Sequence, residues 1–477
     1  MEMTQLSADA SSIRVLHVLA NGPPDVNGYA IRSHSILEEQ QRGGSVSPVG
    51  LTSPWYPERA SMVEAYEQND VRYLRTRHPA HDSGLGGLRM AWLRRRGLKK
   101  FARLNTPPVP VGDTSSNPFP LRAAAYGWVR LRRLLRPILR FLQPGPSWLE
   151  EKILFRHFER RILEVAEQEK PQVIHAHTPY RVGLPAMRAA RKLDIPFVYE
   201  MRGMWEETAV ANGRWKPWGP AYKRFRHLET KVLRKADAVI CISETLRSEA
   251  ISRGVDPELI TLVPNAVSLS RFEGEDSELL SQARSAMGES AVVGYIGSLR
   301  DIEGVDQTAE AVAALIAKGI DVKLFVLSSE AGQRELQAHC DRLGIGEHTL
   351  IMGPVPHVQV APFYDLIDVF VVSRPDTRVT RLVTPLKPFE AMQRGCALVM
   401  SDLPALAEIV EDGVTGLLYP ADDIESLSDT IHSLIVDDEH RSKLGAAANA
   451  WVEENRTWKS VIQGSLTAYE RVIQATE

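Results

Sequence analysis

Short apolar runs rich in β-branched residues alternate along this chain with stretches of helical periodicity, and this alternation constrains the fold more than any other feature. Such runs are typical of strands that are buried on both faces of a parallel sheet. The runs form two series. The first comprises residues 13–20, 46–51, 172–177, 196–200, 238–243 and 260–265, and the second comprises residues 291–298, 322–328, 349–355, 369–373, 397–402 and 416–419.

Each series supplies enough strands for a doubly wound sheet of its own, with helical patterns between them at 148–170, 184–193 and 222–235. The predicted fold class is therefore α/β, with two Rossmann-like parallel-sheet domains that face a cleft. Pro264, Asn265 and the polar residues that follow indicate a linker. The predicted parts of the chain are an N-terminal domain at 1–266, a second domain at 267–452 and a C-terminal helix within 453–477.

Charge is nearly balanced over the whole chain but unevenly distributed. The 477 residues carry a formal net charge of -3, which argues against a dedicated nucleic-acid binder. Residues 84–146 nevertheless hold thirteen Lys plus Arg against a single acid, Asp113. Two basic amphipathic patterns in this insertion are typical of helices that lie on an anionic membrane surface, although a solvated flap is the alternative. We expect a peripheral membrane contact through 84–146.

Cysteine usage and the first twenty residues bear on the compartment. The three cysteines form no C-x-x-C pair, so they encode neither a disulfide framework nor a zinc ribbon. The first twenty residues lack the basic region and the long apolar run of a secretory signal, and no run of eighteen apolar residues follows. The sequence predicts a cytoplasmic protein, placed at the inner face of the membrane by its insertion.

A glycine-bearing turn at 295–304 joins a predicted strand to a predicted helix. Gly297 would let the backbone approach a ligand, and the free N–H groups of the following helix favour an anion such as a diphosphate. An ordinary βα turn has the same pattern, so that interpretation stays open. Ligands of such sheets bind beyond the carboxyl ends of the strands, so we expect the cleft to be lined by the loops after His177, Ser298, Val355 and Ser373.

A second loop, at 383–390, combines stiffness with charge. Pro385 and Pro388 restrict the backbone, which leaves the Leu386 N–H and the Lys387 ammonium free to meet phosphate oxygens. Glu390 either complements the dipole of the helix that starts there or accepts hydrogen bonds from ribose hydroxyls. The combination within one strand-loop-helix unit favours ligand binding.

Two further strand ends carry polar side chains. His175 and His177 lie on the same side of their strand. We discount a metal site because no carboxylate or cysteine lies at ligand spacing nearby, and we expect His177 to hydrogen-bond a substrate hydroxyl. Arg202 follows another strand and either clamps a phosphate or forms a salt bridge with Glu206 or Glu207.

Several catalytic patterns are absent from the sequence. It contains no G-x-S-x-G elbow, no P-loop, no H-E-x-x-H and no G-x-G-x-x-G at a first βα turn. Hydrolase, kinase and dehydrogenase functions are therefore disfavoured. No strand ends in a clear D-x-D, so a metal-chelating sugar-nucleotide site is not indicated either.

The order of the motifs resembles that of the family 4 retaining glycosyltransferases of the GT-B fold, and most of all their bacterial exopolysaccharide- and exosortase-associated type. The motifs are HVLANGPPDVNGYAIRSHSIL, VIHAHTPY, YEMRGMWEE, ADAVICIS, ITLVPNAV, GYIGSLRDIEGVD, PLKPFEAMQRGCALVMSD and DGVTGLLYP. The resemblance implies a nucleotide-sugar donor held by the second domain, an acceptor held by the first, and transfer without a required cofactor or metal. It also implies that the C-terminal helix crosses back onto the N-terminal domain.

By motif position, the resemblance implies roles for single residues. Gly28 would face the donor phosphates or sugar, His177 the donor sugar, Val355 the nucleobase and Glu390 the ribose. Together with the loop arguments above, this predicts His177, Lys387 and Arg202 as catalytic residues. The predicted donor-binding residues are Gly28, Gly297, Ser298, Arg300, Val355, Thr384, Leu386 and Glu390.

Among the departures of the chain from the family pattern, two change the charge of the site. Many members carry arginine at the position of Ser298 and lysine at the position of Glu303, and the pair neutralises the diphosphate. In this chain Lys387, Arg202 and Arg300 would supply the positive charge.

The predicted function is sugar transfer with retention from a UDP-sugar, or next from a GDP-sugar, to an acceptor such as a lipid-linked sugar in polysaccharide or glycoconjugate biosynthesis. The alternatives are a nucleotide-sugar epimerase of the same fold and a catalytically silent partner subunit. The epimerase would need an acid–base set that does not stand out in the sequence. The missing cation pair is the argument for the silent subunit.

Overall fold

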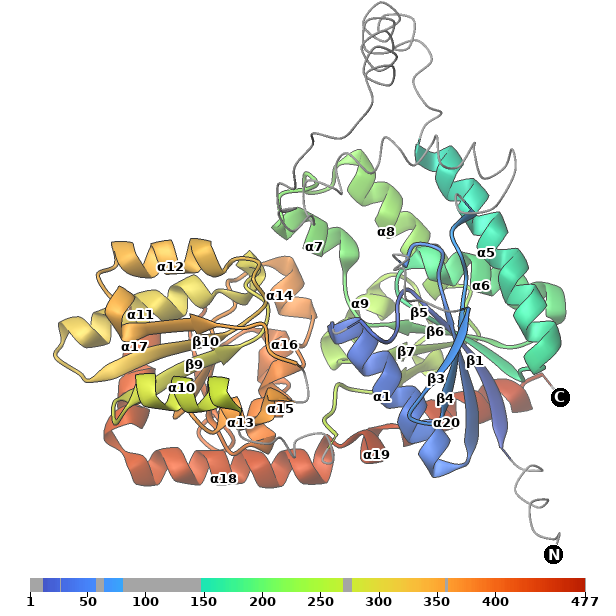
Figure 1. Ribbon diagram of the computed structural model, residues 1–477. Coiled ribbons are helices and arrows are strands. Elements are labelled where there is room, and N and C mark those ends of the chain that lie inside the picture. Colours follow the sequence, from blue (N-terminus) through green and yellow to red (C-terminus); the bar gives the residue numbers. More distant parts are fainter. Residues whose placement is uncertain are drawn as a thin grey trace, which may run out of the picture.

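The computed structural model describes residues 12–25, 27–56, 64–79, 147–268, 277–356 and 359–476. Within these ranges the chain forms two lobes, each built on a β-sheet with helices on both faces (Figure 1). The two sheets confirm the predicted fold class. The basic insertion predicted at 84–146 lies outside the described residues, so its contact with a membrane stays a prediction. None of the helices in the described ranges is long and apolar enough to span a bilayer.

The first lobe contains an eight-stranded sheet in the order β3-β4-β2-β1-β5-β6-β7-β8, in which only the β3–β4 pair is antiparallel. The strands β3 and β4 were not predicted, because neither has a continuous apolar run: β3 is largely exposed, and β4 carries two arginines in five residues. The strands of this sheet are β1 (Ile13–Leu19), β2 (Val46–Thr52), β3 (Ala65–Gln68), β4 (Val71–Arg75), β5 (Val173–His177), β6 (Phe197–Met201), β7 (Ala238–Cys241) and β8 (Ile260–Leu262).

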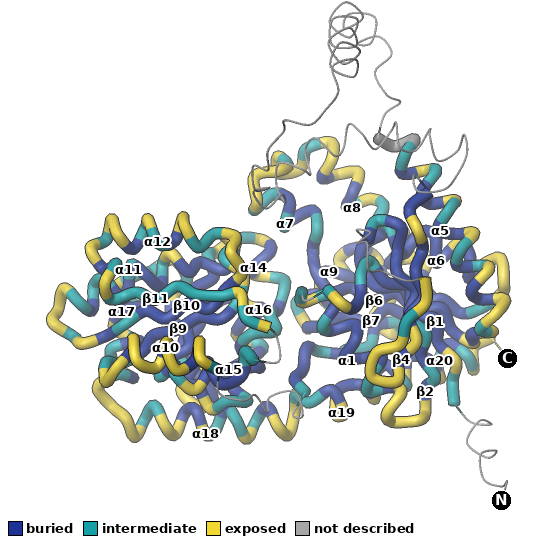
Figure 2. The backbone as a smooth tube through the Cα atoms, in the orientation of Figure 1, coloured by how far each residue is buried: buried dark blue, intermediate teal, exposed yellow. Residues whose placement is uncertain are grey.

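The second lobe contains a six-stranded, fully parallel sheet in the order β11-β10-β9-β12-β13-β14. Buried runs such as VFVV in β12 give this sheet its core, which Figure 2 shows as dark blue strands between helices with exposed outer faces. The strands are β9 (Ala291–Ile296), β10 (Val322–Leu327), β11 (Thr349–Met352), β12 (Val369–Val372), β13 (Ala397–Ser401) and β14 (Leu417–Tyr419).

Helices connect the strands, and several of them begin at a side chain that satisfies one of the first N–H groups. Asn27, Ser243 and Asp423 each accept a hydrogen bond from a backbone N–H in the first turn of their helix. The helices of the first lobe are α1 (Gly28–Gly43), α5 (Ser147–Glu169), α6 (Tyr180–Leu193), α7 (Trp205–Ala211), α8 (Pro220–Leu233) and α9 (Glu244–Ser252). The remaining helices are α10 (Glu278–Met287), α11 (Val305–Ala317), α12 (Gln333–Arg342), α13 (Ala361–Tyr364), α14 (Arg378–Leu382), α15 (Lys387–Gln393), α16 (Pro404–Ala407), α17 (Ile424–Val436), α18 (Asp438–Asn455), α19 (Trp458–Val461) and α20 (Gln463–Gln474).

The chain passes between the lobes twice, and the two crossings are hydrogen-bonded to each other. The Val267 N–H donates to the Arg456 carbonyl at 2.8 Å, and the Trp458 N–H donates to the Val267 carbonyl at 3.1 Å. After the second crossing α20, drawn in red in Figure 1, packs against the first sheet. Gly464 permits this close approach, because a Cβ there would lie 2.6 Å from the Leu262 carbonyl oxygen.

Tyr469 anchors α20 to the interior of the first lobe. Its side chain is fully buried, and its hydroxyl is hydrogen-bonded to His175 Nδ1 at 2.7 Å and accepts from Gln40 Nε2 at 3.1 Å. The last helix is therefore fixed by polar contacts as well as by apolar packing.

Tyr469→Phe should lower the free energy of unfolding by about 1–3 kcal/mol, because it leaves two buried polar atoms without a partner. Urea denaturation of the full chain measures this change. Glu470→Gln, on the exposed side of the same helix, is the matched control and should leave the midpoint unchanged. Equal midpoints for Tyr469→Phe and the wild type would show that α20 is held by apolar packing alone.

Candidate functional site

A cavity of about 810 Å³ lies between the carboxyl ends of the two sheets. The first turn of α1, the loop after β6, the turn after β9 and the loop before α15 all contribute to its walls. All predicted donor-binding residues line it, and so do Lys387 and Arg202. Parallel strands bring their ends to one edge of a sheet, which explains why loops far apart in sequence meet here.

The charged side chains around the cavity form three groups, each centred on a carboxylate. Glu200 binds Arg32 and Arg202, Glu303 binds Arg300 and Arg374, and Glu390 binds Lys387. The five cations all line the cavity. Among the described residues, these groups leave the site with a formal excess of two positive charges, which suits an anionic ligand such as a diphosphate.

The Glu303 group was not predicted from the sequence. Glu303 Oε1 accepts from Arg300 Nη2 at 2.5 Å, while Oε2 accepts from Arg374 Nη2 at 2.7 Å and from Arg374 Nε at 3.0 Å. Burial alone would raise the pKa of the Glu303 carboxyl, but Arg374 and Arg300 outweigh it and hold that pKa below its usual range. Arg374 directly follows Ser373, whose loop was expected to line the cleft, so the sequence did contain a signal for it.

Two glycines near the turn after β9 are required by packing. A Cβ at Gly297 would lie 2.6 Å from the Tyr295 hydroxyl, and one at Gly304 would lie 1.7 Å from the Ser373 carbonyl oxygen. Gly304 also has a φ of 68°, which favours glycine. Gly297 lines the cavity as predicted, but its missing side chain leaves room for Tyr295, which is a reason the sequence did not reveal.

The group around Lys387 lies at the start of α15. Lys387 Nζ donates to Glu390 Oε2 at 2.7 Å, and the hydroxyl of buried Tyr364 donates to the same oxygen at 2.8 Å. About a quarter of the Lys387 side chain is exposed. Gly28 faces this loop from the other lobe, because a Cβ there would lie 3.6 Å from Leu386 Cδ1.

Glu200, at the end of β6, is fully buried and lies behind the cavity wall. Its Oε1 accepts from Arg32 Nε at 2.9 Å and Nη2 at 2.6 Å, and its Oε2 accepts from Arg202 Nη2 at 3.1 Å. Burial would raise the pKa of the Glu200 carboxyl, but the two guanidinium groups hold it well below its usual range. Glu200 was not predicted as a site residue although it ends a predicted strand.

His177 lies in this buried network and not in the cavity. Its Nδ1 lies 2.5 Å from Glu200 Oε2 and also contacts Arg202, and its Nε2 lies 2.9 Å from His17 Nδ1. It does not line the cavity, and only 1% of the residue is exposed. The geometry therefore does not support the predicted hydrogen bond from His177 to a sugar hydroxyl. The reason is that β1 and β6, on either side of β5, supply polar partners for its ring.

Three histidines in this network bear on metal binding. His17, His175 and His177 are buried and offer nitrogen atoms within 4.8 Å of one another. The sequence has no carboxylate at ligand spacing near these histidines, but the fold brings Glu200 into direct contact with His177. Glu200 is already bound to two guanidinium groups, however, and these positive charges oppose a cation at the same place. The three side chains fit a buried hydrogen-bond network better than a metal site.

Arg202 pairs with Glu200 and with neither Glu206 nor Glu207. Its Nη1 donates to the Tyr29 carbonyl at 3.0 Å and to Ser33 Oγ at 2.8 Å, and its Nη2 contacts Glu200 and His177. The proposed alternative of a pair with Glu206 or Glu207 was wrong, since these bind Arg253 and Arg378. Arg202 lines the cavity but uses its guanidinium to hold the first turns of α1.

Direct contacts join the two lobes beside the cavity. Arg32 Nη1 donates to the Pro264 carbonyl at 2.8 Å and to Asn265 Oδ1 at 3.2 Å, and Asn265 Nδ2 donates to the Thr384 carbonyl at 3.1 Å. The linker is thereby tied to the first lobe and to the loop before α15.

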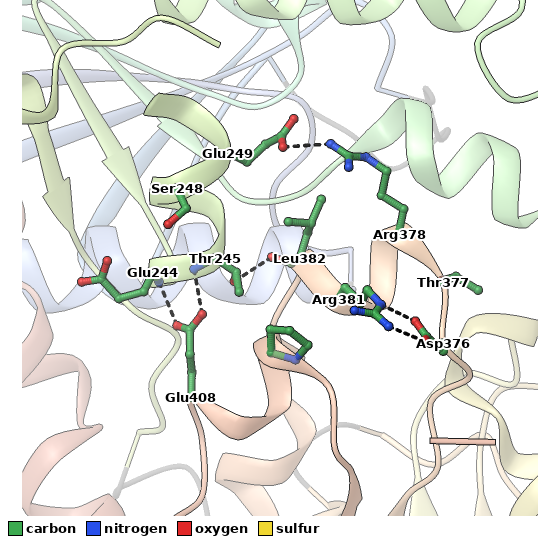
Figure 3. A pocket seen from close by; sticks show the side chains of 11 residues that line it. Glu244, Thr245, Ser248, Glu249, Asp376, Thr377, Arg378, Arg381, Leu382 and Glu408 are labelled. Atoms are coloured by element: carbon green, nitrogen blue, oxygen red, sulfur yellow. Dashed lines mark hydrogen bonds and ion pairs between the residues drawn. The ribbon is translucent and has the colours of Figure 1, made fainter. Parts of the chain in front are cut away.

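A separate groove lies between α9 and α14 (Figure 3), where Glu408 accepts from the backbone N–H groups of Glu244 and Thr245. Arg378 spans the same groove to reach Glu249 at 2.9 Å.

Two family models match adjacent parts of the chain. The model described as Glycosyltransferase Family 4 matches residues 118–271, and the model described as Glycosyl transferases group 1 matches residues 276–451. A D-inositol 3-phosphate glycosyltransferase from Xylanimonas cellulosilytica is 26% identical over 290 residues, which is 58% of this chain and 67% of that protein.

Solved structures show the same fold. Sucrose-phosphate synthase from Thermosynechococcus elongatus superposes with a TM-score of 0.68 at 15% identity, over 97% of this chain and all of that one. HepE from Anabaena, solved in complex with UDP and glucose, superposes with a TM-score of 0.63 at 15% identity, over 96% of this chain and all of that one. At this identity the likeness concerns the fold alone.

Glu408→Gln should loosen the first turn of α9, because an uncharged amide caps a helix N-terminus less well than a carboxylate. The amides of α9 should then exchange hydrogen faster by a few-fold, as expected for the loss of about 1 kcal/mol of capping. Hydrogen–deuterium exchange resolves this helix. Glu411→Gln, an exposed substitution in the same lobe, should leave exchange in α9 as in the wild type. Unchanged exchange in Glu408→Gln would mean that the contact does not stabilise the first turn of α9.

The buried histidines should make the free energy of unfolding decrease as the pH is lowered. Burial is the main reason that the pKa values of His17, His175 and His177 lie well below their usual value. Below about pH 6.5 the unfolded chain binds protons that the folded chain excludes, so the free energy of unfolding falls as pH falls. Each such histidine contributes a slope of up to about 1.4 kcal/mol per pH unit. His17→Gln should reduce the slope between pH 5 and about 6.5 by up to that amount, and identical slopes in urea titrations would contradict the argument.

Proposed function

Because this chain belongs to the group 1 glycosyltransferases of the GT-B fold, we propose that it transfers a hexose from a nucleoside-diphosphate sugar held in the cavity between its two sheets. The observation that carries this proposal is the excess of positive charge on the described cavity walls, at the ends of parallel strands. A diphosphate is the part of a sugar nucleotide that such a charge distribution would bind.

The second lobe supplies most of the donor contacts in this proposal. Val355 lies beside the nucleobase, and Thr384 and Leu386 contact the diphosphate and the sugar. Glu390 accepts hydrogen bonds from the ribose hydroxyls. The position of all four in one cavity supports this arrangement. Uracil is the favoured base, because HepE shares the fold and was solved with UDP, and guanine is the next candidate.

Retention of configuration requires the leaving diphosphate to be stabilised on the face from which the acceptor attacks. Lys387, a quarter exposed at the cavity wall, can donate to a phosphate oxygen from the same position in which it binds Glu390. Fixed cations of this kind supply the electrostatic part of catalysis without reorganisation during the reaction. The leaving phosphate itself then accepts the acceptor proton, so no side-chain nucleophile is needed.

The acceptor side of the proposal rests on the sequence. The first lobe would bind a lipid-linked sugar or a growing polysaccharide, and the basic insertion at 84–146 would place the enzyme on an anionic membrane surface. The resemblance to exopolysaccharide-associated glycosyltransferases supports this assignment.

Lys387→Ala should reduce turnover on the order of 100-fold, because it removes a charge that stabilises the leaving group. The purified chain is screened against nucleotide sugars by thermal shift, and nucleotide release is then followed with candidate acceptors. Lys318→Ala removes an exposed lysine of the same lobe and is the matched control.

The outcomes separate the alternatives. Release of nucleoside diphosphate by the wild type supports transfer, conversion of the sugar without release indicates an epimerase, and binding without consumption indicates a silent partner subunit. Near-normal turnover by Lys387→Ala would remove this side chain from the mechanism.

A further inference from the structure

Glu303 brings together two guanidinium groups that come from different parts of the second lobe. Arg300 lies in the turn after β9, and Arg374 follows β12. The carboxylate is buried, as is Arg374, whereas about half of the Arg300 side chain is exposed. All three residues line the cavity.

Further hydrogen bonds fix the direction of both guanidinium groups. Arg374 Nη1 donates to the Val383 carbonyl at 3.0 Å, next to Thr384, and Arg300 Nε donates to Ser298 Oγ at 3.2 Å. A guanidinium group has five N–H donors in a planar fork. Arg374 uses three of them and Arg300 uses two in the described contacts, so both keep donors for a ligand.

The other cavity arginines are less suited to a ligand. Arg32 donates to Glu200, to Asn265 and to two backbone carbonyls, and Arg202 donates to Glu200, Ser33 and the Tyr29 carbonyl. Arg32 would have to leave a fully buried carboxylate to reach an anion, and breaking a buried ion pair costs several kcal/mol. Arg202 keeps a single donor without a partner, its buried Nε. Arg300 and Arg374 can add a ligand without losing Glu303.

We infer that Arg374 and Arg300 together bind the diphosphate of the donor, and that Glu303 is the positioning residue that holds both guanidinium groups at the cavity. This inference rests on the proposed function and names the residues that supply its positive charge. At the position of Glu303 the sequence indicated only the loss of a cation. In the structure, the carboxylate holds two cations that belong to separate loops.

The sign of one substitution distinguishes positioning from simple charge balance. Glu303 is itself negative, so by charge alone Glu303→Gln would bring the site a further positive charge and tighten diphosphate binding. If Glu303 instead positions the two guanidinium groups, Glu303→Gln releases them and weakens binding. The two roles therefore predict opposite changes in affinity.

The experiment titrates the full chain with UDP and GDP by calorimetry, and continues with the one that binds and with its monophosphate. Arg374→Gln and Arg300→Gln should each weaken diphosphate binding roughly tenfold or more, as expected for a lost charge-assisted hydrogen bond. Monophosphate binding should weaken less. Glu303→Gln should also weaken diphosphate binding, and should weaken it less in an Arg374→Gln background, because only Arg300 is then left for the carboxylate to hold.

Controls keep the result interpretable. Arg381→Gln removes an exposed arginine that pairs with Asp376 in the separate groove, and it should leave affinity unchanged. Arg374→Gln leaves a buried carboxylate with one partner, so thermal unfolding is followed for each variant. The Glu303→Gln/Arg374→Gln double variant, which buries no unpaired charge, provides the same test if the single variant does not fold.

Three results decide the matter. Tighter diphosphate binding by Glu303→Gln, or wild-type affinity in both the Arg374 and the Arg300 variants, overturns the inference while the proposed function stands. Failure of the wild-type chain to bind either nucleoside diphosphate instead contradicts the proposed function. Equal losses for diphosphate and monophosphate would show a structural role for Arg374, which also overturns the inference.

Discussion

A carboxylate with no access to water lies at the centre of the first lobe, and much of the site depends on how its charge is neutralised. Isolated ions are not tolerated in protein interiors, so Glu200 requires hydrogen-bonded cations. Arg32 and Arg202 meet this requirement from α1 and from the loop after β6. Arg32 also binds the linker, and Arg202 also binds the first turns of α1. The neutralisation of one charge thereby fixes one wall of the cavity and the entrance to the second lobe.

Much of the fold follows from the sequence, because a strand buried on both faces must be apolar throughout. This is why the strands of the second sheet were located to within a few residues, whereas exposed β3 was missed. The positions of the cavity residues were predictable for a related reason, since they follow strands whose ends share an edge. The direction of a side chain at such an end depends on neighbouring strands. His177 contacts Glu200 on the neighbouring strand β6 and His17 on the other neighbouring strand, β1. No local sequence pattern reveals that its ring already has these partners.

Contacts between segments far apart in the sequence were also beyond prediction. Asn265 was recognised as part of a linker, but its hydrogen bond to Thr384 depends on how the lobes are oriented. Glu408 caps a helix of the other lobe, and Glu303 binds an arginine from another loop. In each case the sequence shows an ordinary polar residue, and the partner is set by tertiary packing. Pairing of carboxylates with cations from different loops is a recurrent way in which this chain joins its parts.

The excess of positive charge around the cavity also affects the end of a reaction cycle. In the proposed reaction, transfer of the sugar frees a phosphate oxygen, which takes the acceptor proton. Once that proton has left to solvent, the nucleoside diphosphate is more negative than the sugar nucleotide that entered. The five cations and three carboxylates around the cavity therefore attract the charge of the product more strongly than that of the substrate. Departure of the nucleotide requires these contacts to break, and product release of this kind limits the rate of many enzymes. In the proposed reaction, nucleotide that accumulates would compete with the donor for the same cations, so turnover would depend on how quickly the surroundings remove it.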